Sequence, residues 1–183
     1  MGGYLEMRKL PYTGCNPRVM LLGRDKSLTK SLLSYHRIPV PRFLIVPRER
    51  KVRRPKRLAF PLFVKSLTMD SSIGISQASV VETDAKLSER VNFIHESIGT
   101  DALVEQYIEG REFYVTVLGN TKLEVLPIRE LVFGNAEPGT PHMATYKVKW
   151  DDKYRERWGI EYQFARNLPN GMEERIGHLC KRV

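Results

Sequence analysis

Apolar residues recur with helical spacing in three parts of the chain. After Asp25, a suitable N-cap, leucines at positions 28, 32 and 33 predict a helix that stops at Tyr35, because two prolines follow shortly. Asp84 is expected to cap a second amphipathic helix, whose apolar residues at positions 87, 91, 94 and 98 precede a terminating Gly99. A third helical pattern begins after a Pro-Asn-Gly turn and is still running at the last residue, which indicates that the chain is cut short.

Short apolar runs predict strands between and after these helices. The first compact unit, at about residues 43–108, follows a β-β-α-β order, and a polar, glycine-ended loop between its second and third strands is typical of a hairpin. Further strands follow as a meander, and residues 133–145 are expected to be a loop. The fold class is therefore α+β. The predicted strands are 43–46, 61–67, 75–81, 102–108, 112–118 and 123–128.

The composition is that of an ordinary globular protein. The chain has 183 residues, 42% of them hydrophobic and 28% charged, enough for one domain or two small ones. No apolar run approaches the roughly 20 residues that span a bilayer, and the N-terminus lacks signal-peptide order, so a cytoplasmic setting without a membrane partner is expected. Cys15 and Cys180 are far apart and the four histidines are scattered, so neither a disulfide nor a zinc site is expected.

The net charge of +9 is concentrated in one segment. Residues 47–57 hold seven basic side chains and one acid, a local charge of +6, which leaves +3 for the rest of the chain. Clustered Lys and Arg gain affinity by neutralising phosphates, so a basic nucleic-acid-binding module is an alternative function. A single loop with few interleaved aromatic residues lacks a stacking platform, which disfavours nucleic acid as a partner.

Polar residues occupy positions where a plain core would be apolar. Lys65 shares one side of its strand with Phe63, so a covered ammonium group there requires an anion such as phosphate; an edge-strand lysine that reaches water is the alternative. The following loop, Ser71-Ser72-Ile73-Gly74, offers hydroxyls and successive N–H groups that suit a phosphate. Taken alone, it suits a simple hairpin loop equally well.

Two acids, Glu105 and Glu112, lie at opposite ends of a predicted strand-turn-strand pattern. Glu105 shares a strand face with Leu103 and Tyr107, so a buried carboxylate there requires donors, for example the exocyclic amine of a base. Glu112 is placed to accept hydrogen bonds from the hydroxyls of a ribose. Each acid alone is also compatible with an ordinary surface ion pair, and Lys26 alone with a solvated helix lysine.

These residues belong to a series of motifs that covers roughly residues 10–130. The series is Pro11-Tyr12-Thr13-Gly14, Arg24-Asp25-Lys26, Leu28-Thr29-Lys30, Ile38-Pro39-Val40-Pro41, Phe60-Pro61-Leu62-Phe63-Val64-Lys65, Ser71-Ser72-Ile73-Gly74 and the segment from Glu105 to Glu112. In this order the motifs resemble the central part of an ATP-grasp ligase, and more closely the D-alanine–D-alanine ligase branch of that superfamily.

The resemblance implies a partial ATP-grasp fold and an ATP-dependent, ADP-forming carboxylate-amine ligase. ATP phosphorylates a carboxylate in such enzymes, and an amine of an amino-acid or peptide substrate then attacks the acyl phosphate, with Mg2+ and positive charges stabilising the transferred phosphoryl group. The implied domains are residues 1–24 as a remnant of the preceding N-terminal domain, 25–108 as the small subdomain with its leading helix, and 109–183 as the incomplete start of the large subdomain.

The resemblance also implies an ATP-binding role for nine residues. Lys26 and Lys65 are similar to the two lysines on the phosphates, Ser71, Ser72 and Gly74 to the small lid loop, Glu105 to the acid beside the adenine amine, the backbone of Gln106 and Ile108 to the groups on the adenine edge, and Glu112 to the ribose acid.

The family's metal-binding acids and asparagine, and an arginine that assists the acyl phosphate, follow the helix that begins here at Met172. We therefore expect the Mg2+ ligands beyond Val183, no catalytic or metal-binding residue within the chain, and little or no ligase turnover from the chain alone. Lys149 and Trp150 fall in the place of a mobile loop over the active site and receive no role. The substrates and the oligomeric state stay open, and a degenerate ATP-grasp unit used as an interaction domain is a third alternative.

Overall fold

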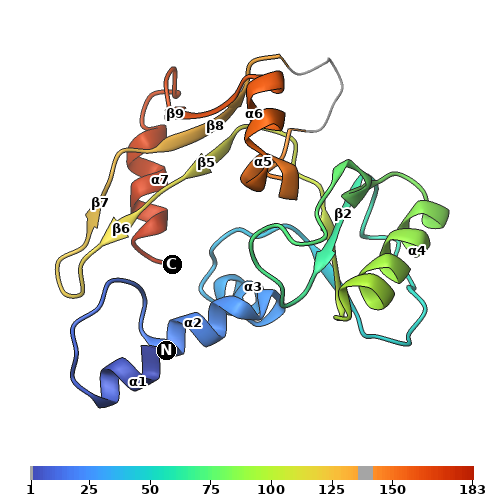
Figure 1. Cartoon of the computed structure of the whole chain (residues 1–183), viewed down its shortest axis with the longest axis horizontal. Helices are drawn as coiled ribbons and strands as arrows, with labels where there is room; N and C mark the ends of the chain where they lie inside the picture. The colour runs from blue at the N-terminus through green and yellow to red at the C-terminus, as the bar shows by residue number, and fades with distance from the viewer. Residues whose placement is uncertain (1, 136–141) are drawn as a thin grey trace.

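The first of two sheet-containing parts is built on a four-stranded antiparallel sheet with strand order β1-β4-β2-β3 (Figure 1). A computed structural model of the chain describes residues 2–135 and 142–183. The elements of this part are β1 (Phe43–Val46), β2 (Leu62–Ser66), the 3-10 turn η1 (Gln77–Ser79), β3 (Val80–Val81), α4 (Asp84–Phe93), the π turn η2 (Ile94–Ile98) and β4 (Ala102–Gln106).

The two faces of this sheet differ in chemistry because side chains alternate along each strand. One face packs against α4 and forms the main core, in which Leu62, Val64 and Leu87 are fully buried. The other face is mixed, since Glu105 lies between its register partners Phe43 and Phe63, and Lys65 follows Phe63 on the same side of β2. The sheet therefore has an apolar side that stabilises the fold and a side that is available for chemistry.

The second part has a smaller hydrophobic core than the first. A three-stranded antiparallel sheet with order β5-β8-β9 continues into a two-stranded ribbon, β6-β7. Its buried hydrophobic cluster consists of Leu131, Val148 and Ile160. The elements are β5 (Glu112–Tyr114), β6 (Val117–Leu118), β7 (Glu124–Val125), β8 (Arg129–Phe133), α5 (Tyr146–Trp150), α6 (Asp152–Trp158), β9 (Ile160–Phe164) and α7 (Met172–Cys180).

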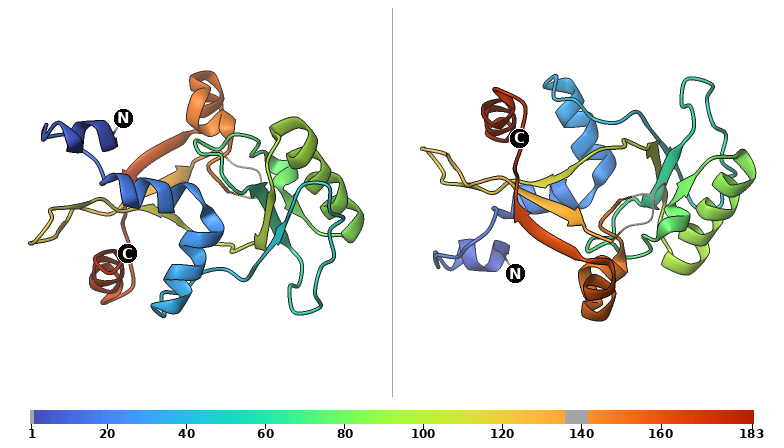
Figure 2. Two further views of the ribbon diagram at one scale, coloured as in Figure 1. Left: turned by 90° about the horizontal axis from the view of Figure 1, so that it is seen from below. Right: turned by 90° about the horizontal axis from the view of Figure 1, so that it is seen from above.

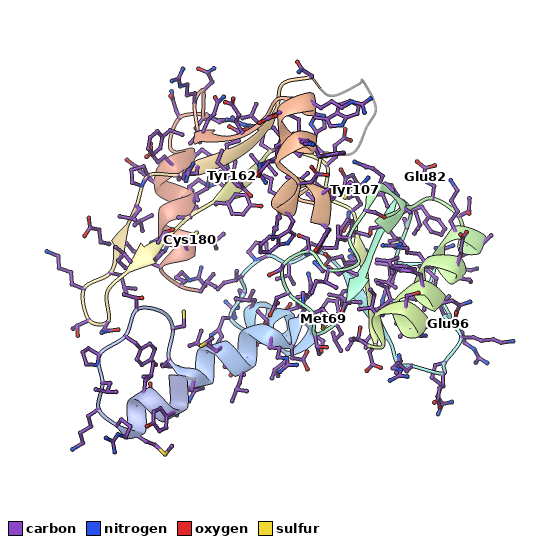
Figure 3. The ribbon with its side chains drawn as sticks, viewed as in Figure 1. Met69, Glu82, Glu96, Tyr107, Tyr162 and Cys180 are labelled. Atoms are coloured by element: carbon purple, nitrogen blue, oxygen red, sulfur yellow. The ribbon has the colours of Figure 1, made fainter. Side chains whose placement is uncertain are left out.

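Three helices precede both sheets: α1 (Gly2–Met7), α2 (Pro17–Arg24) and α3 (Lys26–Tyr35). Both views in Figure 2 place α1, α7 and the β6-β7 ribbon toward one end of the long axis and α4 at the other. Figure 3 labels Met69 and Tyr107 in the first part and Tyr162 and Cys180 in the second. The described residues contain no helix that is long and apolar enough to cross a bilayer.

The strongest periodic signals in the sequence are confirmed. The helix predicted over 25–35 is α3, and Asp25 is its N-cap, accepting hydrogen bonds from two backbone N–H groups. The strand predicted over 43–46 is β1, and those over 61–67 and 102–108 are β2 and β4, each shorter at its ends. The second helix stops at Gly99, as predicted, with a left-handed φ of +76°. Its last turn is of the π type.

Two predictions near the serine loop are wrong. The N-cap of α4 is Thr83, whose hydroxyl accepts from the Lys86 N–H, and Asp84 instead begins the helix. Only Val80–Val81 of the strand predicted over 75–81 pairs with β2. The reason is local hydrogen bonding: the Ser79 N–H donates to the Ser76 carbonyl, and the Ser79 hydroxyl accepts from the Ser76 N–H. These bonds form a turn instead of strand pairing with β2. The hairpin pairing itself is confirmed.

The second half departs further from the prediction. The strand expected over 112–118 is interrupted between β5 and β6, and that over 123–128 reduces to β7. The loop expected over 133–145 includes the last residue of β8, and residues 136–141 lie outside the described part. The final helix ends at Cys180 and does not run to Val183. The elements not predicted are α1, α2, β8, α5, α6 and β9.

Candidate functional site

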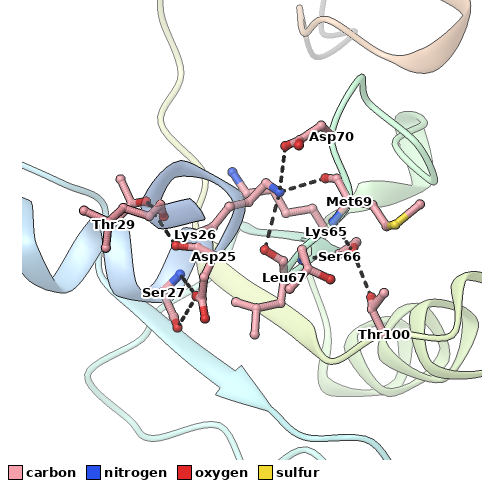
Figure 4. A network of polar contacts seen from close by, with 12 residues as sticks. Asp25, Lys26, Ser27, Thr29, Lys65, Ser66, Leu67, Met69, Asp70 and Thr100 are labelled. Atoms are coloured by element: carbon pink, nitrogen blue, oxygen red, sulfur yellow. Dashed lines mark hydrogen bonds and ion pairs between the residues drawn. The ribbon is translucent and has the colours of Figure 1, made fainter. Parts of the chain in front are cut away.

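Lys26 is held against the segment that follows β2 (Figure 4). Its Nζ donates to the carbonyl of Met69 at 2.7 Å and lies 3.7 Å from a carboxylate oxygen of Asp70. Burial lowers the pKa of Lys26, with Asp70 acting in the opposite direction. The side chain is positioned by the start of α3, where the N-cap bond from the Leu28 N–H, followed by the Ser27 hydroxyl, lowers the pKa of Asp25.

Glu105 is surrounded by lysines on the polar face of the first sheet. Its Oε1 lies 2.5 Å from Lys65 Nζ and its Oε2 lies 2.6 Å from Lys30 Nζ. The side chain of Glu105 is 9% exposed, so the ion pairs are largely shielded from water. The contact with Lys65 also has the geometry of a hydrogen bond, whereas Oε2 has only the close ammonium group within the described residues.

The cluster carries an excess of positive charge. Three ammonium groups, on Lys26, Lys30 and Lys65, face two carboxylates, on Glu105 and Asp70, so the formal sum is +1. Asp70 is mostly exposed, with 68% of its side chain accessible, and water screens its contribution. An incoming anion, above all a phosphate, fits this charge balance.

The serine loop between β2 and η1 has an unusual backbone. Ser71, Ser72 and Gly74 have φ values of +58°, +60° and +73°, a left-handed geometry that turns N–H groups toward one side of a loop. A Cβ added at Gly74 would lie 3.0 Å from two carbons of Ile98, so both space and φ require glycine there. Arg90, on α4, donates to the Gly74 carbonyl and to Ser79 Oγ, which fixes the loop from behind.

The segment 142–150 is bonded to the serine loop at three points. Ser72 Oγ donates to the Ala144 carbonyl at 2.7 Å, so this hydroxyl, predicted to face phosphate, is already engaged. The Tyr146 N–H donates to the Ile75 carbonyl at 3.2 Å, and Trp150 Nε1 donates to the Ser71 carbonyl at 3.1 Å. We call residues 142–150 the strap, because they join the serine loop to the second sheet.

Glu112 lies at the other side of the strap. Its Oε2 accepts from the Ala144 N–H at 3.2 Å and its Oε1 accepts from the Tyr114 hydroxyl. Burial, and then Glu112 itself, raise the pKa of Tyr114, so the phenol stays protonated and remains a donor. The peptide groups of Ala144 therefore connect Glu112 with Ser72.

The end of β4 presents backbone groups next to the cluster. The Gln106 N–H donates to Arg42 O at 2.9 Å. Among the described residues, the Ile108 N–H has no acceptor. Ile108 is 60% exposed, and Tyr107 stacks against Phe63 with ring centroids 6.5 Å apart. A donor beside an aromatic surface suits the edge of a flat heterocycle.

The structure thus brings the predicted residues together in linked groups. Lys26, Lys65 and Glu105 form one cluster, while Ser72 and Glu112 meet through the strap. The residues without a predicted role are Lys30, Arg90, Ala144 and Trp150, of which Trp150 falls in the place of the mobile loop expected over the active site. Lys30 left a signal in the sequence, because it follows Lys26 by four residues and so shares its helix face. The other three depend on contacts between distant segments.

Within residues 2–135 and 142–183, no group of three or more His, Cys, Asp or Glu side chains could hold a metal ion. Cys15 and Cys180 are both free thiols.

The chain matches a known protein family and several curated relatives. A family model described as D-ala D-ala ligase C-terminus matches residues 32–183, so the chain belongs to this family of ligase domains. A relative with 37% identity over 98% of the chain is an uncharacterized protein, y4sG, of Sinorhizobium fredii, of which 48% is covered. The D-alanine–D-alanine ligase of Desulforudis audaxviator is 31% identical over 99% of the chain and 56% of its own length. The chain spans about half the length of these relatives.

Solved structures show the same fold. The D-alanine–D-alanine ligase of Bacillus anthracis complexed with ATP covers 97% of the chain, and 51% of its own length is covered, with a TM-score of 0.69 at 21% identity. The VanG D-Ala:D-Ser ligase of Enterococcus faecalis covers 98% of the chain, with 49% of its own length covered and a TM-score of 0.71 at 23% identity. The mixed helix and sheet arrangement is therefore the ATP-grasp fold.

Proposed function

We propose that the chain is the ATP-binding portion of an ATP-dependent carboxylate-amine ligase. The observation that carries the proposal is the lysine cluster: the ammonium groups of Lys30 and Lys65 bind one buried carboxylate, Glu105, while Lys26 lies against Asp70 in the segment that leads into the serine loop with its left-handed backbone. Family membership supports the same class of reaction. The basic-module alternative is not favoured, because it leaves this cluster unexplained.

In this proposal the phosphates of ATP lie against Lys26, Lys65 and the loop residues Ser71, Ser72 and Gly74. Positive charge there stabilises the phosphoryl group while it passes to a carboxylate, forming an acyl phosphate and ADP. An amine then attacks the acyl carbon, and phosphate leaves as the amide forms. The chain contributes the positioning and the electrostatics of the first step.

The other nucleotide contacts follow from β4 and β5. The adenine edge meets the backbone of Gln106 and Ile108, where a free N–H donor is present among the described residues. The ribose hydroxyls meet Glu112, which would exchange its bond with the Ala144 N–H for bonds with the ribose. The assignment of each residue to a part of ATP is part of the proposal.

The proposed organisation keeps residues 1–24 as a remnant of a preceding domain, 25–108 as the small subdomain and 109–183 as the start of the large one. The ligands of Mg2+ are proposed to lie outside this chain, so it binds nucleotide without completing the ligation. The relatives' names include D-alanine–D-alanine and D-Ala:D-Ser ligases. We therefore propose an amino acid or a peptide as the substrate.

We expect Mg-ATP to raise the melting temperature of the chain. At 100 times the dissociation constant, a ligand that binds only the folded state adds about 2.7 kcal/mol of stability. Lys65→Ala should abolish the shift because it removes an ammonium group from the cluster, whereas Lys56→Ala, at an exposed lysine of the basic segment, should preserve it. Differential scanning fluorimetry provides the measurement, and an unchanged melting curve of the parent chain at saturating Mg-ATP contradicts the proposal.

A further inference from the structure

We infer that the cavity between α4 and residues 77–81 binds a small organic carboxylate with an apolar or aromatic body, and that Arg90 is the residue that holds the carboxylate group. The inference goes beyond the proposed function and does not depend on it. The residues that line this cavity are separate from the lysine cluster, and α4 lies at the end of the first part that faces away from the second sheet (Figure 1).

Arg90 is a buried cation without a bound acid. The residue is 8% exposed, and among the described residues no carboxylate forms an ion pair with its guanidinium group. The bonds that it makes go to neutral acceptors, the Gly74 carbonyl and the Ser79 hydroxyl. In the same described part of the chain, its buried Nε has no acceptor. An unpaired buried charge costs folding free energy, so a bound anion recovers part of that cost.

The charges that line the cavity favour an anion with a single charge. Lys86 and Glu89, both exposed, line it together with Arg90. Burial lowers the pKa of Arg90, and Glu89 acts in the opposite direction. The formal sum is +1, counted as two basic residues minus one acid, so a carboxylate balances it. A doubly charged phosphate would place excess negative charge beside Glu89. The two oxygens of a carboxylate also match the planar guanidinium group.

The remaining walls of the cavity suit an apolar body. Val81 is buried, whereas Phe93 is 37% exposed, and both line the cavity. The guanidinium carbon of Arg90 is 4.3 Å from the centroid of the Phe93 ring, so the cation and the aromatic ring are adjacent. The cavity volume of about 340 Å³ lies near the lower end of the range for small-molecule sites. One small molecule, with its carboxylate on Arg90 and a ring or branched chain against Phe93, fits this arrangement.

The serine loop shares Arg90 with this cavity, because the same guanidinium group donates to the Gly74 carbonyl. Within the loop, the Ile73 N–H donates to the Asp70 carbonyl at 3.2 Å and the Ile75 N–H donates to the Ser72 carbonyl at 3.0 Å. A carboxylate on Arg90 restricts the guanidinium group and thereby stabilises the anchor of the loop. The amides of Ile73 and Ile75 should then exchange with deuterium more slowly.

The test uses phenylacetate as the probe, with phenylacetamide as a ligand of the same shape and no charge, and inorganic phosphate as the third ligand. Titration calorimetry on the parent chain should give the highest affinity for phenylacetate. Phenylacetamide should bind about tenfold more weakly, because hydrogen bonds between two charged groups are stronger than those to a neutral acceptor. Arg90→Met should lower the affinity for phenylacetate by about the same factor and change that for phenylacetamide much less.

A second variant keeps the test decisive if Arg90→Met fails to fold. Ala78 is exposed and lines the cavity, so Ala78→Phe fills the space while Arg90 and its bonds stay in place. It should abolish phenylacetate binding and the slower exchange of the serine loop. Lys86→Met should weaken phenylacetate about threefold, the effect of one exposed charge. Lys51→Met, at an exposed lysine outside the cavity, is its matched control and should change nothing.

Circular dichroism establishes that each variant is folded before it is titrated. The inference is overturned if the parent chain does not bind phenylacetate, if it binds phenylacetamide equally well or phosphate more tightly, or if a folded Ala78→Phe variant binds phenylacetate like the parent. None of these outcomes bears on nucleotide binding, which the melting experiment with Mg-ATP tests separately.

Discussion

At the scale of single residues, Lys26 lies in an environment that changes its protonation. Lys26 is bound to backbone carbonyls and is partly buried, so its pKa is lowered below the ordinary lysine value. Below that lowered pKa, the charged side chain costs folding free energy. As pH rises toward the ordinary lysine pKa of about 10.4, the unfolded state binds more protons than the folded state, and the stability of the folded chain increases.

We predict that ATP binding takes up a proton in this alkaline range. A phosphate next to Lys26 favours the ammonium form and raises its pKa again, so the complex holds a proton that the free protein has partly lost. Calorimetric titrations in two buffers with different ionisation enthalpies, at a pH just below the ordinary lysine value, measure the uptake. The Lys26→Met variant should show less uptake than the parent, and equal uptake in both would show that another group is responsible.

At the scale of elements, the first turn of α3 determines where two of the cluster's lysines point. Asp25 closes this turn with bonds from the N–H groups of Ser27 and Leu28, at 2.9 and 3.0 Å. Lys26 and Lys30 follow on one face of the helix. A change in the cap therefore alters the nucleotide site without touching a side chain proposed to contact ATP.

We predict that Asp25→Ala lowers the free energy of unfolding by about 1 kcal/mol, the usual effect of losing an N-cap. ATP affinity should also fall, because Lys26 begins the frayed turn. Denaturant titration with and without ATP gives both quantities. Asp25→Asn is the matched variant, since an asparagine also caps well and should preserve both. An Asp25→Ala variant that binds ATP like the parent would show that the cap does not position Lys26.

Elements with a strong local pattern were predictable and those that depend on partners were not. The helix α3 and the strand β1 each have a complete signal in their own residues. By contrast, β8 and β9 pair with each other along five register positions. Their own residues carry no clear strand pattern, so the two strands depend on this pairing. The same holds in the candidate site: Lys26 and Lys65 are named by the motif order, but the contact of Lys30 with Glu105 depends on α3 lying beside β4.

At the scale of the whole molecule, the two sheets have unequal cores. Ten buried residues form the cluster beneath the first sheet, including Leu62, Leu87 and Val104, whereas the described cluster of the second contains three. Burial of apolar surface is the main source of stability, so the first part should resist opening more strongly than the second.

We predict that backbone amides of β2 and β4 exchange with deuterium more slowly than those of β8 and β9. Local opening requires less free energy where fewer apolar contacts are lost. Native-state hydrogen exchange read by mass spectrometry tests this order. Leu87→Ala, which should cost about 2 to 5 kcal/mol, is expected to accelerate exchange in β2 and β4 selectively. Equal protection in both sheets would mean that the chain opens as one cooperative unit.

The hydrogen bonds of Ala144 have a consequence for how firmly a nucleotide is held. Its carbonyl binds Ser72 and its N–H binds Glu112, so the protein itself occupies the acid proposed to meet the ribose. A nucleotide that binds Glu112 has to break the hydrogen bond between Glu112 and the Ala144 N–H. The measured dissociation constant then includes the free energy of breaking this bond as well as that of the new contacts. Nucleotides without a reachable ribose hydroxyl leave the bond between Ala144 and Glu112 intact, so they avoid this cost and also lack the bonds with Glu112.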